Sequence, residues 1–277
     1  MSALTLQDVE TAITALPGLS TVILEVLQTI DTGTAEVNVL ERLINKDHGL
    51  AARILQIANS PFYGMCGQID TVKDACILLG VHTLRHLTLA CGVMDRFPAD
   101  AGGDFDRRSL WRHAVAVGVA ARTLATHCRH DADQAFTAGL LHDLGKLALD
   151  SCFPVQYAAV QRYRETHDCA LLPAEIALLG FDHSNVGARL ATRWRLPAVT
   201  CAAIGGHHAP DLAPAPLTDL VHLADVVCRG LAVGDKGDTP VPPMSPLVMQ
   251  RLGLRWEQLD GMFAEIEQLS AASAMLA

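Results

Sequence analysis

The sequence predicts an all-α protein built from two helical bundles. Half of its 277 residues are hydrophobic and only 5% are aromatic, and its abundant alanine and leucine are strong helix formers. Apolar residues recur with the helical period along most segments, and no run alternates like a strand for more than four residues. A chain this long and this apolar can form a sizeable core, which excludes a largely disordered protein.

The first hundred residues predict the N-terminal bundle. The apolar positions within residues 19–30 form one helical face, and two more helices are expected within residues 34–64. Asp47 is a good N-cap for the second of these two. A longer helix follows over residues 70–94 and should break at Gly80.

A linker rich in Pro, Gly and Asp, residues 95–108, separates this bundle from the next. We therefore expect an N-terminal subdomain over residues 1–100 and a C-terminal subdomain over residues 101–277. A Pro/Gly-rich loop is expected at 234–246, before the last helix. The helices of the C-terminal subdomain, which bring the expected total to about twelve, are predicted at 109–128, 133–153, 154–167, 172–180, 182–196, 197–208, 216–232 and 254–275.

Charge and cysteine content restrict the class of protein further. The net charge is −9 and no long Lys/Arg cluster is present, so nucleic acid is not an expected partner. No segment reaches the roughly 18 uninterrupted apolar residues of a membrane helix, and the first ten residues carry acids where a signal peptide needs basic residues. The eight cysteines form no CxxC pair and are expected to be buried free thiols. These features predict a cytoplasmic protein.

Histidine and aspartate residues in the second half form a candidate metal site. Burying a His–Asp pair such as the one in "AGLLHDLGKLAL" costs several kcal/mol unless another interaction offsets the lost hydration. Any one of these histidines alone is more often a hydrogen-bonded core or surface residue. Imidazole and carboxylate together are the ligands that iron, manganese and zinc accept. The candidate ligands are His113, His142, Asp143, His183, His207, His208 and Asp225.

The remaining histidines are interpreted as helix-surface or interface residues. His82 and His86 are spaced i,i+4, but no carboxylate or third ligand accompanies them in the sequence. The same interpretation applies to His48, His127, His130, His167 and His222.

The order His…His-Asp…Asp, with helices between its parts, resembles the HD superfamily of metal-dependent phosphohydrolases. The segments "LWRHAVAVGVAARTLA", "AFTAGLLHDLGKLAL", "LLGFDHSNVGARLATRWRLP" and "HHAP" resemble more specifically the HDOD domain, the HD-related output domain of bacterial signalling proteins. In the N-terminal half, "LPGLSTVILEVLQTI", "LINKDHGLAARILQIANSPFYG" and "ACILLGVHTLRHL" resemble the bundle of that same family. The resemblance extends over residues 15–235.

The resemblance implies an HD-like C-terminal bundle and a set of metal ligands. Four of the candidates, His113, His142, Asp143 and Asp225, match the ligands of the basic HD site. The three others match the residues that bind a second metal in the related HD-GYP phosphodiesterases, with Asp143 as the bridging ligand. Two such ions bind phosphate oxygens and generate a hydroxide near neutral pH.

Two differences from the related enzymes limit the expected substrate and the expected number of metal ions. "HHAPDLAPAPL" lacks the Glu and the Gly-Tyr-Pro loop of HD-GYP enzymes, so hydrolysis of cyclic-di-GMP is not expected. Ser109 stands where trinuclear members carry a Glu, so one or two divalent ions are expected. Lys146 is either a phosphate contact or a solvated cation at a helix end.

Two functions therefore remain open. The family resemblance favours a bacterial signal-transduction module that binds other signalling proteins, since many HDOD members have lost HD-type catalytic residues. The complete ligand set favours metal binding and, as the alternative function, a metal-dependent phosphohydrolase acting on a nucleotide or other phosphate ester. Metal ligands alone do not distinguish a structural from a catalytic site.

Overall fold

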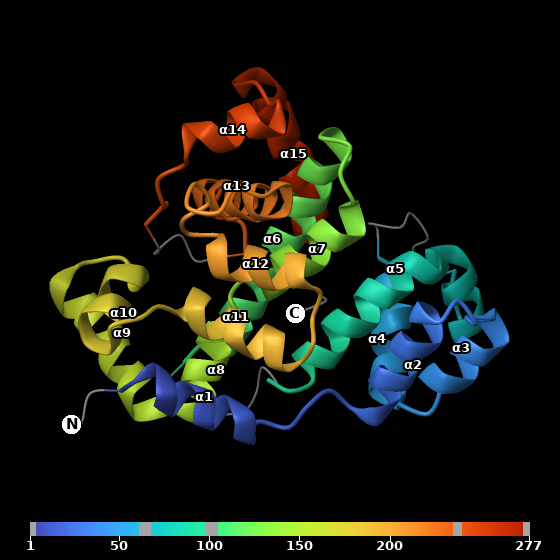
Figure 1. The fold of residues 1–277 in the computed structure, drawn as a ribbon. Coiled ribbons are helices and arrows are strands. Elements are labelled where there is room, and N and C mark those ends of the chain that lie inside the picture. The colour runs from blue at the N-terminus through green and yellow to red at the C-terminus, as the bar shows by residue number, and fades with distance from the viewer. Residues whose placement is uncertain (1–3, 61–67, 98–104, 235–239, 274–277) are drawn as a thin grey trace.

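The computed structural model describes residues 4–60, 68–97, 105–234 and 240–273, and all regular elements in them are α-helices (Figure 1). This confirms the predicted all-α class. The first helices are α1 (Leu6–Ala15), α2 (Thr21–Asp31), α3 (Val37–Ile44), α4 (His48–Ala58) and α5 (Val72–Met94). The others are α6 (Arg107–His127), α7 (Ala132–Leu141), α8 (Leu144–Cys152), α9 (Pro154–His167), α10 (Leu171–Leu179), α11 (His183–Arg193), α12 (Ala198–Gly206), α13 (Pro216–Gly230), α14 (Pro246–Leu252) and α15 (Trp256–Ser273).

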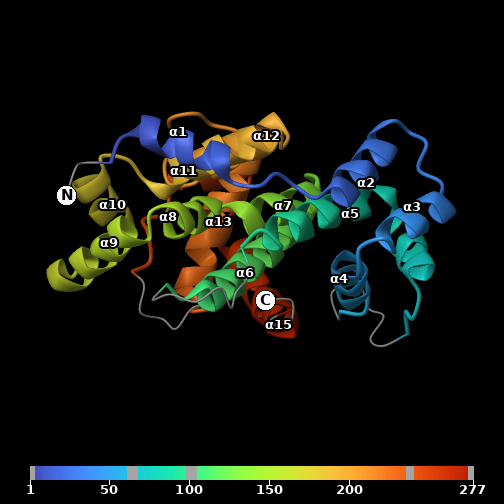
Figure 2. The ribbon, with the colours of Figure 1, turned by 90° about the horizontal axis from the view of Figure 1, so that it is seen from below.

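Helix α5 organises the N-terminal bundle. Helices α2, α3 and α4 pack against it, and its C-terminal arm packs against α7 (Figure 2). The predicted break at Gly80 is confirmed: this residue has φ 73° and ψ 164°, a conformation that a residue with a Cβ rarely adopts. The two arms of α5 therefore point in different directions.

Helix α1, like the short helix α14, was not among the expected helices. A capping box between Thr5 and Asp8 starts it, and Val9 and Ile13, four residues apart, bury its apolar face. Although it comes first in the chain, α1 packs on α8 and α11 of the C-terminal half, as Figures 1 and 2 both show. A contact between Arg189 and Glu10 supports this position.

Helix α6 is the centre of the C-terminal half, where it contacts α7, α13 and α15. One hydrophobic core runs from α1 and the N-terminal bundle into α8–α12, and a second core lies among α6, α7 and α12–α15. The predicted boundary near residue 100 falls in residues 98–104, which lie outside the described residues, and the subdomain division stays a prediction.

Two features bear on the expected cellular location. Among the described helices, α5 is long and apolar enough to cross a membrane, but 67% of its most apolar window is buried against other helices. The described cysteines are free thiols, as predicted, but only Cys76, Cys91 and Cys228 are buried, because the others lie at helix ends or on half-exposed faces.

Candidate metal centre

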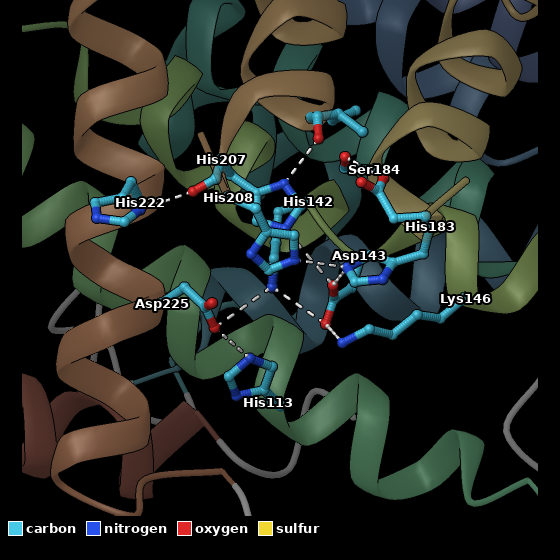
Figure 3. Close-up of polar contacts among 12 residues, drawn as sticks. His113, His142, Asp143, Lys146, His183, Ser184, His207, His208, His222 and Asp225 are labelled. Atoms are coloured by element: carbon cyan, nitrogen blue, oxygen red, sulfur yellow. Dashed lines mark hydrogen bonds and ion pairs between the residues drawn. The ribbon is translucent and has the colours of Figure 1, made fainter. Parts of the chain in front are cut away.

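The His142–Asp143 pair lies in a break between two helices. The single helix predicted over residues 133–153 is divided there, since α7 ends at Leu141 and α8 begins at Leu144. Asp143 has φ −94° and ψ 14°, outside the ideal helical values. The break directs two adjacent side chains into the same buried space, where Asp143 is only 2% exposed (Figure 3).

The first set of candidate ligands gathers around Oδ1 of Asp225. The neighbouring helices α6 and α13 carry His113 and Asp225 to facing positions, and Nε2 of His113 lies 2.9 Å from this oxygen. Nε2 of His142 lies 3.8 Å from it. His113, His142 and Asp143 also offer one ligand atom each within 4.8 Å of one another. The structure thus brings together four residues that lie up to 112 positions apart.

The second set consists of His183, His207 and His208, whose ligand atoms also lie within 4.8 Å of one another. His183 is the first residue of α11, and Asp182 caps that helix by accepting a hydrogen bond from the amide of Asn185. His207 and His208 follow directly after α12. Nε2 of His208 lies 2.9 Å from Nε2 of His183.

Asp143 lies between the two sets. Its Oδ1 is 3.1 Å from Nε2 of His183 and 3.9 Å from Nε2 of His207. Its Oδ2 is 3.2 Å from Nε2 of His142. One carboxylate oxygen therefore faces each set of histidines (Figure 3), which is the arrangement that a bridging ligand requires.

Two backbone contacts fix the tautomers of the central histidines. Nδ1 of His142 donates to the carbonyl of Gly139 at 2.6 Å, and Nδ1 of His207 donates to the carbonyl of Ile204 at 2.7 Å. A carbonyl oxygen only accepts, so Nδ1 carries a proton, and in the neutral imidazole Nε2 then keeps its lone pair. Both Nε2 atoms, like Oδ1 of Asp143, are buried and have no hydrogen-bond partner among the described residues. Buried, unpartnered lone pairs that converge on one space fit a divalent metal ion.

The ionisation of the site also suits a cation. Burial alone raises the pKa of Asp143, but its neighbours, His142 and Lys146 first among them, hold it well below its usual range. Burial likewise raises the pKa of Asp225, and Arg229 lowers it well below that range. Burial lowers the pKa of His207 to about 3, so this imidazole is neutral at physiological pH. The centre therefore offers two carboxylates and neutral imidazole nitrogen.

Glu175, which the sequence analysis missed, lies behind the second set. It is fully buried on α10 and its Oε2 accepts hydrogen bonds from Nδ1 of His183 at 2.6 Å and from the His183 amide at 2.9 Å. Burial lowers the pKa of His183, but Glu175 outweighs this effect and raises it to about 9. The only signal in the sequence was a single acid in the apolar segment "LPAEIALLG".

Two cations contact the ligands directly. Nζ of Lys146 lies 2.6 Å from Oδ2 of Asp143, and this side chain is buried, so the alternative of a solvated cation at a helix end is wrong. The second cation, Arg229, was not predicted. Its Nε lies 2.9 Å from Oδ1 of Asp225, and its Nη2 lies 3.2 Å from Nε2 of His113. Arg229 therefore contacts the lone pairs of Asp225 and His113 that a metal ion bound by the first set would require.

Helices α8 and α11 approach each other at two glycines. A Cβ on Gly145 would overlap the carbonyl oxygen of His183 and reach within 2.7 Å of the amide of Gly187. The glycine after the His–Asp pair therefore allows α8 to touch the backbone of the helix that carries His183.

The structure corrects the interpretation of three further histidines. His86 and His222 are buried, not on the surface, because α5 and α13 are enclosed by neighbouring helices. His222 donates from Nδ1 to the carbonyl of His207 at 2.7 Å. His82 is exposed as predicted, but Asp131 accompanies His82 and His86. The interpretation is confirmed for the four exposed histidines His48, His127, His130 and His167.

The centre opens into a cavity of about 1260 Å³. His113, Asp143, His183 and His208 form part of its wall. Helix α9 contributes Arg162 and Arg164, and residues 240–243 form a Pro-rich part of the lining. Drug-sized ligands typically occupy cavities of about 300–1,000 Å³, so this one has room for a nucleotide.

An all-α fold with buried histidines and aspartates in this arrangement defines an HD-type helical protein. The sequence profile of the HDOD domain matches residues 16–210. The chain therefore belongs to the HDOD domain family.

Two curated relatives are longer than this chain. An uncharacterized protein of Treponema pallidum is 26% identical over 251 residues, which cover 88% of this chain and 47% of the relative. Ribonuclease Y of Latilactobacillus sakei is 27% identical over 189 residues, which cover 68% of this chain and 30% of the relative. This chain thus spans less than half the length of the relatives it matches.

Solved structures share the whole fold. An HDOD domain protein of unknown function from Geobacter sulfurreducens is 25% identical, with a TM-score of 0.82 and coverage of 99% of both chains. A candidate phosphohydrolase from Shewanella amazonensis is 23% identical, with a TM-score of 0.79 and coverage of 97% of both chains. At this identity the second likeness establishes the fold alone.

Proposed function

We propose that this protein is a metal-dependent phosphohydrolase that cleaves a nucleotide-sized phosphate ester. The observation that carries the proposal is the position of Asp143 between two sets of buried histidines at the wall of a large cavity. When bound, a divalent ion supplies a Lewis acid and a water of lowered pKa. The name of the Shewanella amazonensis structure agrees with this class of activity.

The residues that would hold the ion are His183, His207, His208 and Oδ1 of Asp143. Three imidazoles and one carboxylate suit iron, manganese or zinc. We propose one ion in each chain, because the guanidinium of Arg229 already neutralises Asp225 and contacts His113 in the first set.

Cationic side chains of the cavity would bind the phosphate. Lys146 and Arg229 place their charges beside the carboxylates of the centre, and Arg162 and Arg164 add two guanidinium groups from α9. Arginine donates two parallel hydrogen bonds to a phosphate, which fixes its orientation. The cavity wall would then hold the nucleoside or other organic part of the ester.

Metal content and hydrolysis test this proposal together. Wild type, a His142→Ala/Asp143→Ala double variant and a His127→Ala control should be expressed in medium with iron, manganese and zinc, and then assayed by elemental analysis. The substrates are p-nitrophenyl phosphate, its diester, nucleoside phosphates and a short oligoribonucleotide. We expect about one ion and phosphate release in wild type and the control, and neither in the double variant.

Two results would contradict the proposal. Metal-free wild type from this medium would exclude a metal centre. Metal-loaded wild type that hydrolyses none of the esters would instead favour a structural ion. Cleavage of the oligoribonucleotide alone would make RNA the substrate, as the name of the ribonuclease Y relative suggests for that protein, and would overturn the expectation that nucleic acid is not a partner.

The second candidate function is signalling through protein partners, favoured by an exposed apolar surface on α5. Ile77 and Leu78 lie at the end of the N-terminal arm of this helix, Val81 follows the break at Gly80, and all three are exposed. A photo-crosslinking residue at position 77 should capture a defined partner in cells, whereas the same residue at Val155, which is equally exposed, should not. Identical capture patterns at the two positions would count against this surface.

A further inference from the structure

A second group of metal-type ligands lies where α5 meets α7, and it shares no residue with the centre around Asp143. His82 and His86 are one turn apart on α5, and Asp131 is the N-cap of α7. One ligand atom from each of the three lies within 4.8 Å of the others. Two histidines at i and i+4 on one helix face are a recurrent arrangement for binding zinc.

Two carboxylates at the start of α7, Asp131 of this group and the neighbouring Asp133, face the exposed His82. Nε2 of His82 lies 3.5 Å from Oδ2 of Asp131, and its Nδ1 lies 3.9 Å from Oδ2 of Asp133. Asp131 uses its other oxygen, Oδ1, to cap α7 by accepting from the amide of Gln134 at 2.9 Å. Oδ2 of Asp131 therefore faces His82 without giving up the helix cap.

His86 gives an independent indication of a ligand. Its side chain is only 6% exposed, and its Nδ1 is a buried atom with no hydrogen-bond partner among the described residues. Its ring centroid lies 5.1 Å from that of His82. Burial lowers the pKa of His86, which keeps the imidazole neutral and able to coordinate a metal. Leaving such a nitrogen unsatisfied costs free energy, which a bound cation would recover.

The surroundings join the two helices beside the three residues and leave the site accessible. Oγ1 of Thr83 donates to Oδ2 of Asp133 at 2.6 Å, which connects α5 to α7 directly beside the group. Arg122 of α6 lies 2.8 Å from the other oxygen of Asp133. The side chain of His82 is 67% exposed, so an ion can enter from solvent.

We propose that His82, His86 and Asp131 form a second site for a divalent transition metal such as Zn²⁺, and that the ion fastens α5 to α7. Tetrahedral coordination at about 2.1 Å places ligand atoms about 3.4 Å apart, so modest rotation of the exposed His82 completes the site. Water fills the remaining coordination position. The site is independent of the proposed phosphohydrolase activity.

Zinc titration of the protein as purified, with its resident metal retained, tests this site. The extra equivalents of Zn²⁺ that bind and the resulting rise in melting temperature should be measured for wild type, His82→Ala, Asp131→Asn and the control His48→Ala. Asparagine is also a good N-cap, so Asp131→Asn removes the charge and keeps α7 capped.

We expect wild type and His48→Ala to bind one additional Zn²⁺ and to melt at a higher temperature in its presence. His82→Ala and Asp131→Asn should bind this ion at least about tenfold more weakly and lose most of the rise. Equal zinc binding by wild type and His82→Ala would overturn the proposal. The resident metal should be unchanged in all four proteins, so the outcome does not depend on the Asp143 centre.

Discussion

The buried carboxylate of Glu175 accepts a hydrogen bond from Nδ1 of His183 at 2.6 Å. This contact directs Nε2 of His183 toward Oδ1 of Asp143, 3.1 Å away. Carboxylates in this position orient metal-binding histidines and increase their basicity. Glu175 therefore acts on the centre through His183.

Replacing Glu175 with Gln should weaken metal binding by about 10- to 100-fold, because the amide no longer supplies the negative charge behind His183. Competition with a chromogenic chelator would measure this affinity. Glu165→Gln is the matched control, since Glu165 lies on the exposed side of α9 and lines the same cavity. If Glu175→Gln bound metal with wild-type affinity, Glu175 would have no role in the centre.

Replacing Arg229 with Ala should raise the metal content from about one ion to two. The substitution leaves His113 and Asp225 buried without the guanidinium that contacts both of them, and an unpaired buried carboxylate attracts a cation. Elemental analysis of proteins from the same metal-supplemented medium gives the answer. Arg255→Ala, on the exposed surface before α15, should keep the wild-type content. Two ions already present in wild type would contradict the role we assign to Arg229.

Gly145→Ala should destabilise the fold by about 3 kcal/mol or more, because the added Cβ would overlap the His183 carbonyl and force α8 away from α11. Urea unfolding measures this change. A Cβ on Gly261, within α15, meets no atom within 4 Å, so Gly261→Ala should instead stabilise by about 0.5–1 kcal/mol. Similar effects of the two substitutions on stability would show that α8 and α11 can move apart without loss of stability.

The metal-free protein should be most stable near pH 6.5. Burial and the neighbouring imidazoles lower the pKa of His207 to about 3 in the folded state. The unfolded chain therefore takes up this proton first, and the contribution of His207 is lost as the pH falls from about 6.5 toward 3. Glu175 outweighs burial and raises the pKa of His183 to about 9. Its contribution is complete below about pH 6.5 and is lost as the pH rises through 9.

The midpoints of urea unfolding, measured on chelator-treated protein at about pH 5, 6.5 and 9, would show both the loss of stability toward acid pH and the loss toward alkaline pH. Because burial also lowers the pKa of His208, His207→Gln should reduce but not abolish the loss of stability at acid pH, and Glu175→Gln should reduce the loss at alkaline pH. His127→Gln, which changes an exposed histidine, should leave both unchanged. A midpoint that rises steadily from pH 5 to 9 would contradict the assignment to these two histidines.

The sequence was sufficient for the helical class, because periodicity is a local property, and its resemblance to the HD and HDOD families singled out the seven residues that the fold gathers. It was insufficient for Glu175 and Arg229, since an acid in an apolar helix and an arginine four residues after Asp225 resemble ordinary helix residues. Their roles depend on helix packing that no local pattern encodes.

The same reason explains the error on the α5 histidines. Asp131 lies 49 residues after His82, so the carboxylate beside this pair was not apparent from its neighbours in the sequence. The helix break at His142 and Asp143 was also missed, because the apolar pattern continues through it.

The contact between Gly145 and the backbone of α11 has a consequence for how the centre can change over evolutionary time. Asp143 and His183 are carried by two main-chain segments that touch directly, so their separation is a property of the backbone and not of the surrounding side chains. Substitutions along the cavity can therefore alter which ligand fits there while the spacing of the candidate metal ligands stays constant. A lineage can change what the cavity binds without rebuilding the candidate metal centre.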